Sequence, residues 1–550
     1  MNVSEDVIIS AHPVNAKSGS DSAVGEDISG TRQYLKSINF RLRSIMKRRS
    51  TYITHPSHAV DPKDIKFSSD RVQLAGVKAA REERLTIGLK ELPNEIVDVL
   101  EQSHDLHVRW ASDKFYNVTE PLVSRISPGL HIHYTPLKDD QPDNLCDVIH
   151  TVFGKDLKCV SPKTTFITPP VLSARFARTA NFQYYSELPN VKSLVLYLQR
   201  QLCNYSDLSC LHSASLLNIA DSIDIDYDSI SHALTFTAFW SKQPDITYDP
   251  ISDSTAVDRW MIDIRSRGTE RVELGILSSE AAQDPSELSL SGFLTVLGQD
   301  DRPKATLFSF PSRHHRLPDQ KYTVSFDRPI GLHPILRISF PSASNLVEPT
   351  NKPAGSVCAL QTYLTLPSHI FIDKWAFLSN DPLFQKSHNL GQLHTVAGDT
   401  DLEAPDYVVK QWGSTALFSI LTQEDNQTSS SSSSSSDNRS WDVTIPMHLR
   451  YLTPHAGGFS DVDIPWPVVF WACTAEDGTK FPVNPFDRTQ LGFEGLFGPR
   501  TMFYHVQPSP QDNQAGRLVE TISLPVLNTQ AMSQSTIENL TVATILLGFL

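Results

Sequence analysis

The chain has 550 residues and a formal net charge of -14, with 40% hydrophobic and 20% charged residues. A chain of this length is expected to form two to four domains, because single hydrophobic cores stop growing near ~250 to 300 residues. The hydrophobic fraction is typical of a folded globular protein, and the acidic balance argues against nucleic acid as a main partner.

Residues 1–49 form a distinct basic segment. After a polar start, the stretch TRQYLKSINFRLRSIMKRRS contains seven lysine or arginine residues and no acidic residue. We expect a disordered basic extension here. Two alternatives are a basic amphipathic helix that binds anionic lipid or nucleic acid, and untranslated upstream sequence with Met46 as the true start. The first residues lack the apolar core of a secretory signal.

Residues 50–242 alternate helix and strand signals. In ELPNEIVDVLEQSH, Pro93 marks a helix start and apolar residues recur at helical spacing. VKSLVLYLQRQL repeats this pattern, whereas GLHIHY (129–134) and ALTFTAFW (233–240) are typical of strands. The pattern predicts an α+β domain.

The next two segments differ sharply in character. Residues 243–320 are polar and rich in proline, with weak strand signals in RWMIDI and RVELGIL, and we interpret them as a polar linker or insertion. From residue 321 to residue 535, nine apolar runs from YTVSF to ETISLPVL are separated by turn residues. This spacing predicts an antiparallel β-sandwich. The chain is therefore expected to be mainly β, with an α+β N-terminal domain followed by an antiparallel β-sandwich C-terminal domain. The serine run at 429–436 is expected to be a solvated loop.

One strand of the all-β region shows strict alternation. In VTIPMHLRY, every second residue from Val443 to Tyr451 is apolar, and Arg450 falls among the intervening residues. This pattern predicts a core face that includes Tyr451 and a wet face that includes Arg450.

A second strand, DIPWPVVFWAC (463–473), begins with the same alternation, with Trp466 inward and Pro465 and Pro467 outward. The two prolines remove two amide donors along one edge, so no neighbouring strand is expected to pair there. Beyond Pro467 both faces are apolar, which predicts a strand covered on both sides. The cover is either another part of the same domain or a partner protein.

The chain offers little catalytic chemistry. It contains no GxSxG, Walker, HExxH or Rossmann pattern. His131 and His133 share a strand face, but no third ligand stands nearby, so we do not favour a metal site. We interpret SRHHR (312–316) as an exposed basic turn. Four acidic residues could pair as in a glycosidase, although a solvated acidic loop is the better interpretation; they are Asp399, Asp401, Glu403 and Asp406. No cofactor is expected.

Cysteines and glycosylation sequons give information on the cellular compartment in which the protein folds. The six cysteines allow 15 pairings, and we expect Cys203 and Cys210 as a disulfide, although buried thiols would be equally normal. Four sequon asparagines are candidates for glycosylation: Asn117, Asn204, Asn426 and Asn438. The tail TVATILLGFL (541–550) is expected to be a truncated C-terminal transmembrane segment, the alternative being an apolar strand.

Several long strings resemble the PIG-X/Pbn family. They are IPMHLRYLTP (445–454), VDIPWPVVFWACTAEDGTKFPVNPFDR (462–488), GLFGPRTMFYHV (495–506), CALQTYLTLPSHIFIDKWAF (358–377) and GDTDLEAPDYVVKQWGSTALF (398–418). The last two resemble its fungal branch closely, as do VKAAREERLTIGLKELP and VSRISPGLHIHYTP nearer the N-terminus. The likeness covers about residues 46–550 and leaves the first 45 outside it.

The resemblance implies an endoplasmic reticulum membrane protein with a lumenal body. Its implied role is a non-catalytic subunit that stabilises the PIG-M-type catalytic subunit of glycosylphosphatidylinositol (GPI) mannosyltransferase I. The alternatives are a general lumenal chaperone and, less favoured, a glycan hydrolase. The expected partner surface comprises Trp466, Val469, Trp471, Phe486, Phe497 and Arg500.

Overall fold

The computed structural model describes residues 47–58, 60–138, 144–170, 182–242, 260–265, 270–282, 284, 287–342, 346–377, 381–422, 440–475, 491–510, 516–530 and 533–549. The chain divides into two units, Met1–Ser44 and Ile45–Leu550, and all the described residues belong to the second. The expected extension up to residue 46 and the serine run lie outside the described residues.

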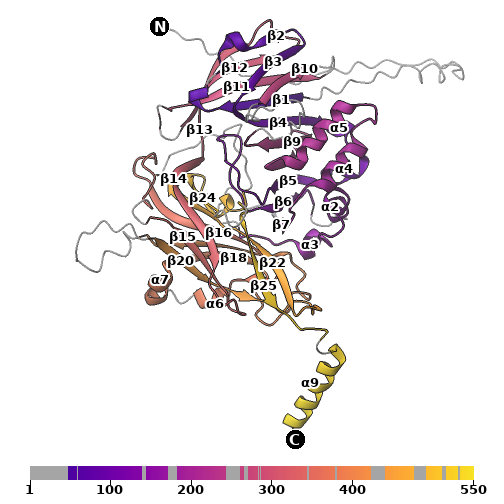
Figure 1. Cartoon of the computed structure of the whole chain (residues 1–550), viewed down its shortest axis with the longest axis vertical. Helices are drawn as coiled ribbons and strands as arrows, with labels where there is room; N and C mark the ends of the chain where they lie inside the picture. Colours follow the sequence, from indigo (N-terminus) through magenta and orange to yellow (C-terminus); the bar gives the residue numbers. More distant parts are fainter. Residues whose placement is uncertain are drawn as a thin grey trace, which may run out of the picture. The chain divides into compact units, whose positions relative to one another are not determined.

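A ten-stranded sheet dominates the N-terminal half, in the order β13-β12-β11-β1-β4-β9-β8-β5-β6-β7 (Figure 1). All neighbouring pairs are antiparallel except β1 and β11. Its strands are β1 Lys47–Thr54, β4 Ala79–Gly88, β5 Ser103–Ala111, β6 Gly129–Pro136, β7 Phe182–Ser186, β8 Ser222–Asp228, β9 Ala233–Trp240, β11 Arg271–Glu280, β12 Glu287–Val296 and β13 Lys304–Pro311.

Helices and a small sheet pack on this large sheet. The helices are α1 Asn94–Leu100, α2 Leu145–Phe153, α3 Pro162–Thr165, α4 Lys192–Gln201 and α5 Leu208–Ser215. The short 3₁₀ helices are η1 Pro56–His58, η2 Pro62–Asp64, η3 Leu89–Glu91 and η5 Leu216–Ile219. The small sheet has the order β10-β3-β2, with β10 Trp260–Arg265, β3 Arg71–Val77 and β2 Lys66–Ser68. Apolar side chains of all three layers form one buried cluster, which confirms the helix signals.

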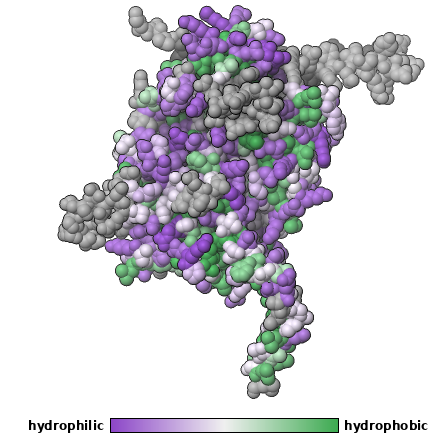
Figure 2. Space-filling model, viewed as in Figure 1, coloured by the Kyte–Doolittle hydropathy of each residue, from purple (hydrophilic) through white to green (hydrophobic). Residues whose placement is uncertain are grey.

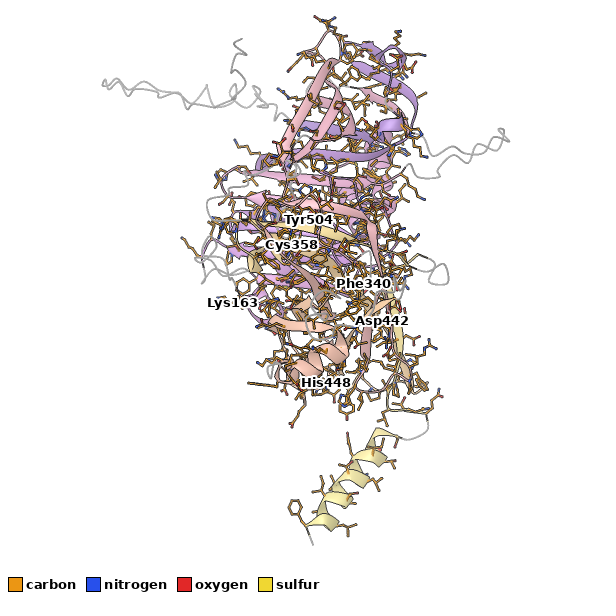
Figure 3. The ribbon with its side chains drawn as sticks, turned by 90° about the vertical axis from the view of Figure 1, so that its left-hand side faces the viewer. Lys163, Phe340, Cys358, Asp442, His448 and Tyr504 are labelled. Atoms are coloured by element: carbon orange, nitrogen blue, oxygen red, sulfur yellow. A yellow bond between two sulfur atoms is a disulfide. The ribbon has the colours of Figure 1, made fainter. Side chains whose placement is uncertain are left out.

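An eight-stranded sheet forms the second half, in the order β18-β19-β16-β23-β24-β14-β15-β20. Its strands are β14 His314–Phe326, β15 Ile335–Phe340, β16 Val357–Pro367, β18 Leu390–Gly398, β19 Gly413–Ile420, β20 Trp441–Pro446, β23 Val468–Thr474 and β24 Thr501–Pro508. Two further pairs are β17 Ile370–Phe371 with β21 His448–Leu449, and β22 Phe459–Pro465 with β25 Val519–Pro525. Figure 3 locates Phe340, Asp442 and His448 on β15, β20 and β21. The fold is mainly β, as predicted.

The remaining helices are α6 Lys374–Phe377, α7 Pro382–His388, η7 Glu494–Leu496 and α9 Gln534–Gly548. Helix α6 falls within IFIDKWAF (370–377), one of the nine apolar runs that were expected to be strands. Helix α7 has a helix start signal in Asp381, whose side chain accepts from the Leu383 amide, and its C-cap residue is Asn389, with a φ of 48°.

Helix α9 begins at Ser533, whose side chain caps its first turn. Most of its apolar side chains are exposed, and Figure 2 shows hydrophobic residues along it. No helix in the described ranges is long and apolar enough to cross a membrane.

The structure corrects the expected linker at 243–320. Its described residues include β11, which pairs in parallel with β1, and β12 and β13, which extend the same sheet. The polar composition was misleading because these strands are polar on one face: Ser289 and Ser309 carry hydrogen-bonding hydroxyls across the pair. Likewise, residues 47–49 of the expected extension belong to β1, where Arg49 pairs with Glu273.

Candidate functional site

The segment around Pro465 and Pro467 connects two sheets. Strand β22 ends at Pro465 and pairs with β25, whereas β23 starts at Val468 and lies between β16 and β24. The prediction of one continuous strand is therefore wrong, as is the prediction that no neighbour pairs beside Pro465, whose register partner is Val519. Both prolines are buried, not outward.

Side chains from distant elements hold this crossover. Trp466 is 2% exposed and donates from Nε1 to Glu520 Oε1 at 2.9 Å. Its carbonyl oxygen accepts from Ser127 Oγ at 3.1 Å. The carbonyl oxygen of Pro467 accepts from Tyr322 Oη at 2.7 Å. The crossover therefore satisfies its main-chain groups through side chains of both halves of the chain.

Strand β23 is covered on both faces, as predicted. Val469, Trp471 and Cys473 belong to one buried cluster. Phe470 belongs to another, which also includes Ala111 and Ile126 from the N-terminal half. The cover is therefore supplied by the same chain.

This packing changes the expected partner surface. Trp466, Val469 and Trp471 are buried, so they offer no surface to a partner in this structure. Phe497 and Arg500 are half-buried, and Arg500 Nη1 donates to the Ala475 carbonyl at 3.3 Å. Phe486 lies outside the described residues.

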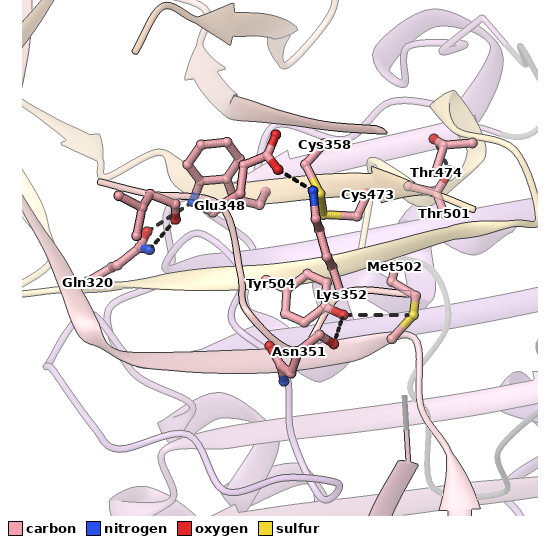
Figure 4. Close-up of a disulfide and its surroundings, with 12 residues drawn as sticks. Gln320, Glu348, Asn351, Lys352, Cys358, Cys473, Thr474, Thr501, Met502 and Tyr504 are labelled. Carbon is pink, nitrogen blue, oxygen red and sulfur yellow. Dashed lines mark hydrogen bonds and ion pairs between the residues drawn. A yellow bond between two sulfur atoms is a disulfide. The ribbon is translucent and has the colours of Figure 1, made fainter. Parts of the chain in front are cut away.

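All six cysteines are paired. The disulfides are Cys146–Cys159, Cys203–Cys210 and Cys358–Cys473. The last joins neighbouring positions of β16 and β23 (Figure 4), close to Tyr504, which donates to the Asn351 carbonyl at 2.7 Å. Three disulfides and no free thiol are typical of proteins that fold in an oxidising compartment.

The SRHHR sequence is not an exposed turn. His314 and His315 are buried at the start of β14, which pairs in parallel with β24. The ring of His314 stacks on Phe503 at 5.0 Å, and its Nδ1 lies 3.1 Å from Nε2 of His505. The sequence prediction failed because a run of basic residues suggests an exposed turn. These residues instead belong to a strand, in which the imidazoles pack as aromatic rings.

Electrostatics in this histidine cluster are set by burial. Desolvation holds the pKa of His505 well below its usual range, and the charge of His314 contributes. Desolvation also lowers the pKa of His315 to about 4. Burial by itself would raise the pKa of Glu494, yet its bond and charge interaction with His314 keep that pKa lowered. No sequence signal linked Glu494 to these histidines, since it lies on a separate 3₁₀ turn.

His131 and His133 are core residues. His131 donates from Nε2 to the Ser127 carbonyl at 2.7 Å, and desolvation lowers its pKa to about 4. Desolvation also holds the pKa of His133 well below its usual range. Within the described residues there is no group of three or more His, Cys, Asp or Glu that could hold a metal ion.

The acidic loop is organised by Arg450. The guanidinium donates to the carbonyl oxygens of Asp401, Asp399 and Ala404, and it lies 4.3 Å from the ring centre of Phe371. This buried position contradicts the predicted wet face, and Tyr451, expected inward, is 67% exposed. The alternation fails because β20 and β21 belong to different sheets.

The acidic side chains themselves are engaged locally. Asp399 Oδ1 lies 3.3 Å from Arg450 Nη2 and accepts from the Asp401 amide, and Asp401 Oδ1 accepts from the Glu403 amide. Asp406 accepts from Ser368 and pairs with Lys158 at 3.4 Å. These contacts fix the loop and do not place two carboxylates across a substrate cleft.

Two of the candidate glycosylation sites can be located. Asn117 and Asn204 are exposed. The side-chain oxygen of Asn204 accepts from the amide and hydroxyl of Ser206, the hydroxyl residue of its sequon. Asn426 and Asn438 lie outside the described residues.

These features define a disulfide-bonded, mainly β protein whose candidate chemical groups stabilise the fold. Comparison with known proteins gives the family. The family model described as PIG-X / PBN1 matches residues 329–550. Relatives named Protein pbn1 are 46% identical in Emericella nidulans, over 92% of this chain and 94% of the relative, and 38% identical in Neurospora crassa, over 88% and 90%. The relative of that name in Aspergillus oryzae is 46% identical over 88% of this chain and 90% of its own length. The chain belongs to the PIG-X/PBN1 family.

Proposed function

We propose that this chain is located in the endoplasmic reticulum and is a non-catalytic subunit of GPI mannosyltransferase I. In this role it stabilises the catalytic subunit, which is a PIG-M-type protein. The observation that carries the proposal is family membership over nearly the whole chain. That membership supports a role in GPI-anchor biosynthesis. The candidate carboxylates and histidines form hydrogen bonds that stabilise the fold, which favours an accessory role over a hydrolase.

Two structural features support the proposed location. Complete pairing of the cysteines favours the lumen, where disulfides persist. The exposed apolar side chains of α9, among them Leu546 and Leu547, favour contact with the membrane.

The proposed contact with the catalytic subunit must use groups that are at least partly exposed. Phe497 and Arg500 remain candidates because they are half-buried. Trp375 and Phe459, which are 66% and 59% exposed, are added by the structure. Exposed aromatic side chains are frequent anchors at protein interfaces.

The mechanism is mass action. A subunit that binds the folded catalytic protein, but not its unfolded form, lowers the unfolded fraction as its concentration exceeds the Kd. Depletion of this chain should therefore reduce the abundance of the catalytic subunit, measured by quantitative proteomics, and the two should co-purify.

The same experiment separates the alternatives. Selective loss of the catalytic subunit supports the proposal, whereas unchanged abundance of that subunit contradicts it. Equal loss of many unrelated lumenal proteins would favour a general chaperone instead. An endoglycosidase mobility shift, reduced by Asn117→Gln or Asn204→Gln, would test the lumenal location.

A further inference from the structure

The N-terminal half contains a cavity of about 450 Å³. One wall is the face of the large sheet formed by β4, β9, β8 and β5, and the opposite wall is formed by α1, α2, α4 and α5. This volume falls within the range of roughly 300–1,000 Å³ that small-molecule sites occupy. The cavity lies outside the segment that the family model matches.

The lining of the cavity is strongly apolar. Leu85 and Phe236 come from the sheet, Ile149 from α2, and Leu194 and Leu198 from α4. Leu85 and Leu198 are only partly buried although they face this interior space. A space with apolar walls favours an apolar occupant over water, because water there would lack hydrogen-bond partners.

Two sets of polar groups in the lining are engaged within the protein. Glu83 accepts from both Arg48 and Arg81 at one end. Asp207 at another part of the lining accepts from the amide of Cys210 and so caps α5. In the part of the chain that the structure describes, none of the buried side-chain atoms without a hydrogen-bond partner belongs to this lining. The lining therefore favours a ligand that is apolar over most of its length.

The helical wall offers an apolar approach to the cavity. Leu202, at the end of α4, lines the cavity and is 41% exposed. The disulfide between Cys203 and Cys210, both in the lining, ties the end of α4 to α5. Only Ala214 of α5 is buried, so this helix covers the cavity without a tightly packed face of its own.

We propose that this cavity binds the hydrocarbon chain of a lipid. The apolar lining, the engaged polar groups and Leu202, which is both part of the lining and exposed, carry the proposal. It goes beyond the proposed stabilising role and does not depend on it. A free fatty acid and an acyl chain of a membrane lipid share this chemistry.

The test is photo-crosslinking to the full chain, purified in a bulky sterol-based detergent. A diazirine analogue of palmitic acid is added and irradiated, and the modified peptides are mapped by mass spectrometry. We expect saturable labelling in α2 and α4. Competition by palmitic acid alone indicates a free fatty acid, and competition by palmitoyl lysophosphatidylcholine indicates a lipid chain.

The matched variants are Leu198→Trp and Leu307→Trp. Leu307 lines a separate cavity of about 430 Å³ beside β11, β12 and β13. We expect Leu198→Trp to weaken labelling of α2 and α4 about tenfold, because added bulk fills the site, and Leu307→Trp to leave it unchanged. Leu202→Glu, at a more exposed position, should weaken labelling in the same way if Leu198→Trp does not fold. Labelling that is not saturable, that neither competitor reduces, that is confined to α9, or that is insensitive to Leu202→Glu would overturn the proposal.

Discussion

Arg450 is a buried cation whose partners are three main-chain carbonyl groups and the carboxylate of Asp399. Arg450→Met should lower the free energy of unfolding by about 3 kcal/mol, because hydrogen bonds to a charged donor are lost and buried acceptors remain. Urea unfolding measures this change. Arg337→Met is the control, since Arg337 forms partly exposed ion pairs with Asp327 and Asp442. It should cost less than about 1 kcal/mol, and equal losses would contradict the role of Arg450.

His131 should make stability depend on pH. Its folded-state pKa is lowered to about 4 by burial, whereas the unfolded chain takes up this proton near pH ~6.5. The unfolded state therefore binds the proton first as the pH falls, and stability is lost between these two values. The loss from this group is about 3 kcal/mol.

The test compares His131→Gln with the parent chain by urea unfolding from pH 7.5 to pH 4. The variant should lose less stability on acidification, although it is less stable at neutral pH. His58→Gln, at an exposed site, is the control. An unchanged pH slope in His131→Gln would show that other groups cause the acid sensitivity.

At the scale of elements, the crossover between β22 and β23 depends on Trp466. Trp466→Ala should cost about 3 to 5 kcal/mol, because a large buried side chain is removed, and the Glu520 carboxylate loses its donor. Trp375→Ala removes an exposed side chain of the same type and should cost less than about 0.5 kcal/mol. Thermal unfolding compares the two variants. If Trp466 instead contacted a partner, Trp466→Ala would weaken co-purification while leaving the isolated chain stable.

At the scale of the whole molecule, the segment matched by the family model is not a complete sheet. The match starts at residue 329, after β14, yet β14 lies between β24 and β15. A chain of residues 329–550 should therefore be degraded rapidly in limited proteolysis, since the edges of β24 and β15 are exposed and the core loses the buried side chain of Tyr322. A chain of residues 312–550 restores β14 and should be more resistant. Equal resistance of the two chains would contradict this expectation.

Much of the fold follows from local pattern. The helices at Pro93 and Val191 and the strand at 233–240 were predicted because their apolar residues repeat at helical or strand spacing. The burial of both faces of β23 was also predictable, since its apolar residues are continuous. Strands β11 to β13 were missed because their polar residues resemble those of a linker. They join the sheet only through the pairing of β11 with β1, of β12 with β11 and of β13 with β12.

The candidate site was harder to predict than the elements. Trp466 was correctly expected to face inward, but Trp466 and Trp471 were also expected on a partner surface, and both are buried in one core cluster. Arg450 and His314 were misplaced, because a polar or basic residue in a strand is usually exposed. Their burial requires acceptors from the loop at 399–404 and rings from β24, which no local window contains.

The sequence by itself determined the mainly β character, the family and most of the strands, because periodicity and long matching strings are local properties. Only the tertiary structure decided that the prolines connect two sheets, that the acidic loop is organised around a buried arginine, and that a cavity lies under the helices of the first half. The physical reason is that burial and hydrogen-bond partners depend on residues distant in the chain, such as Ser127 beside Trp466.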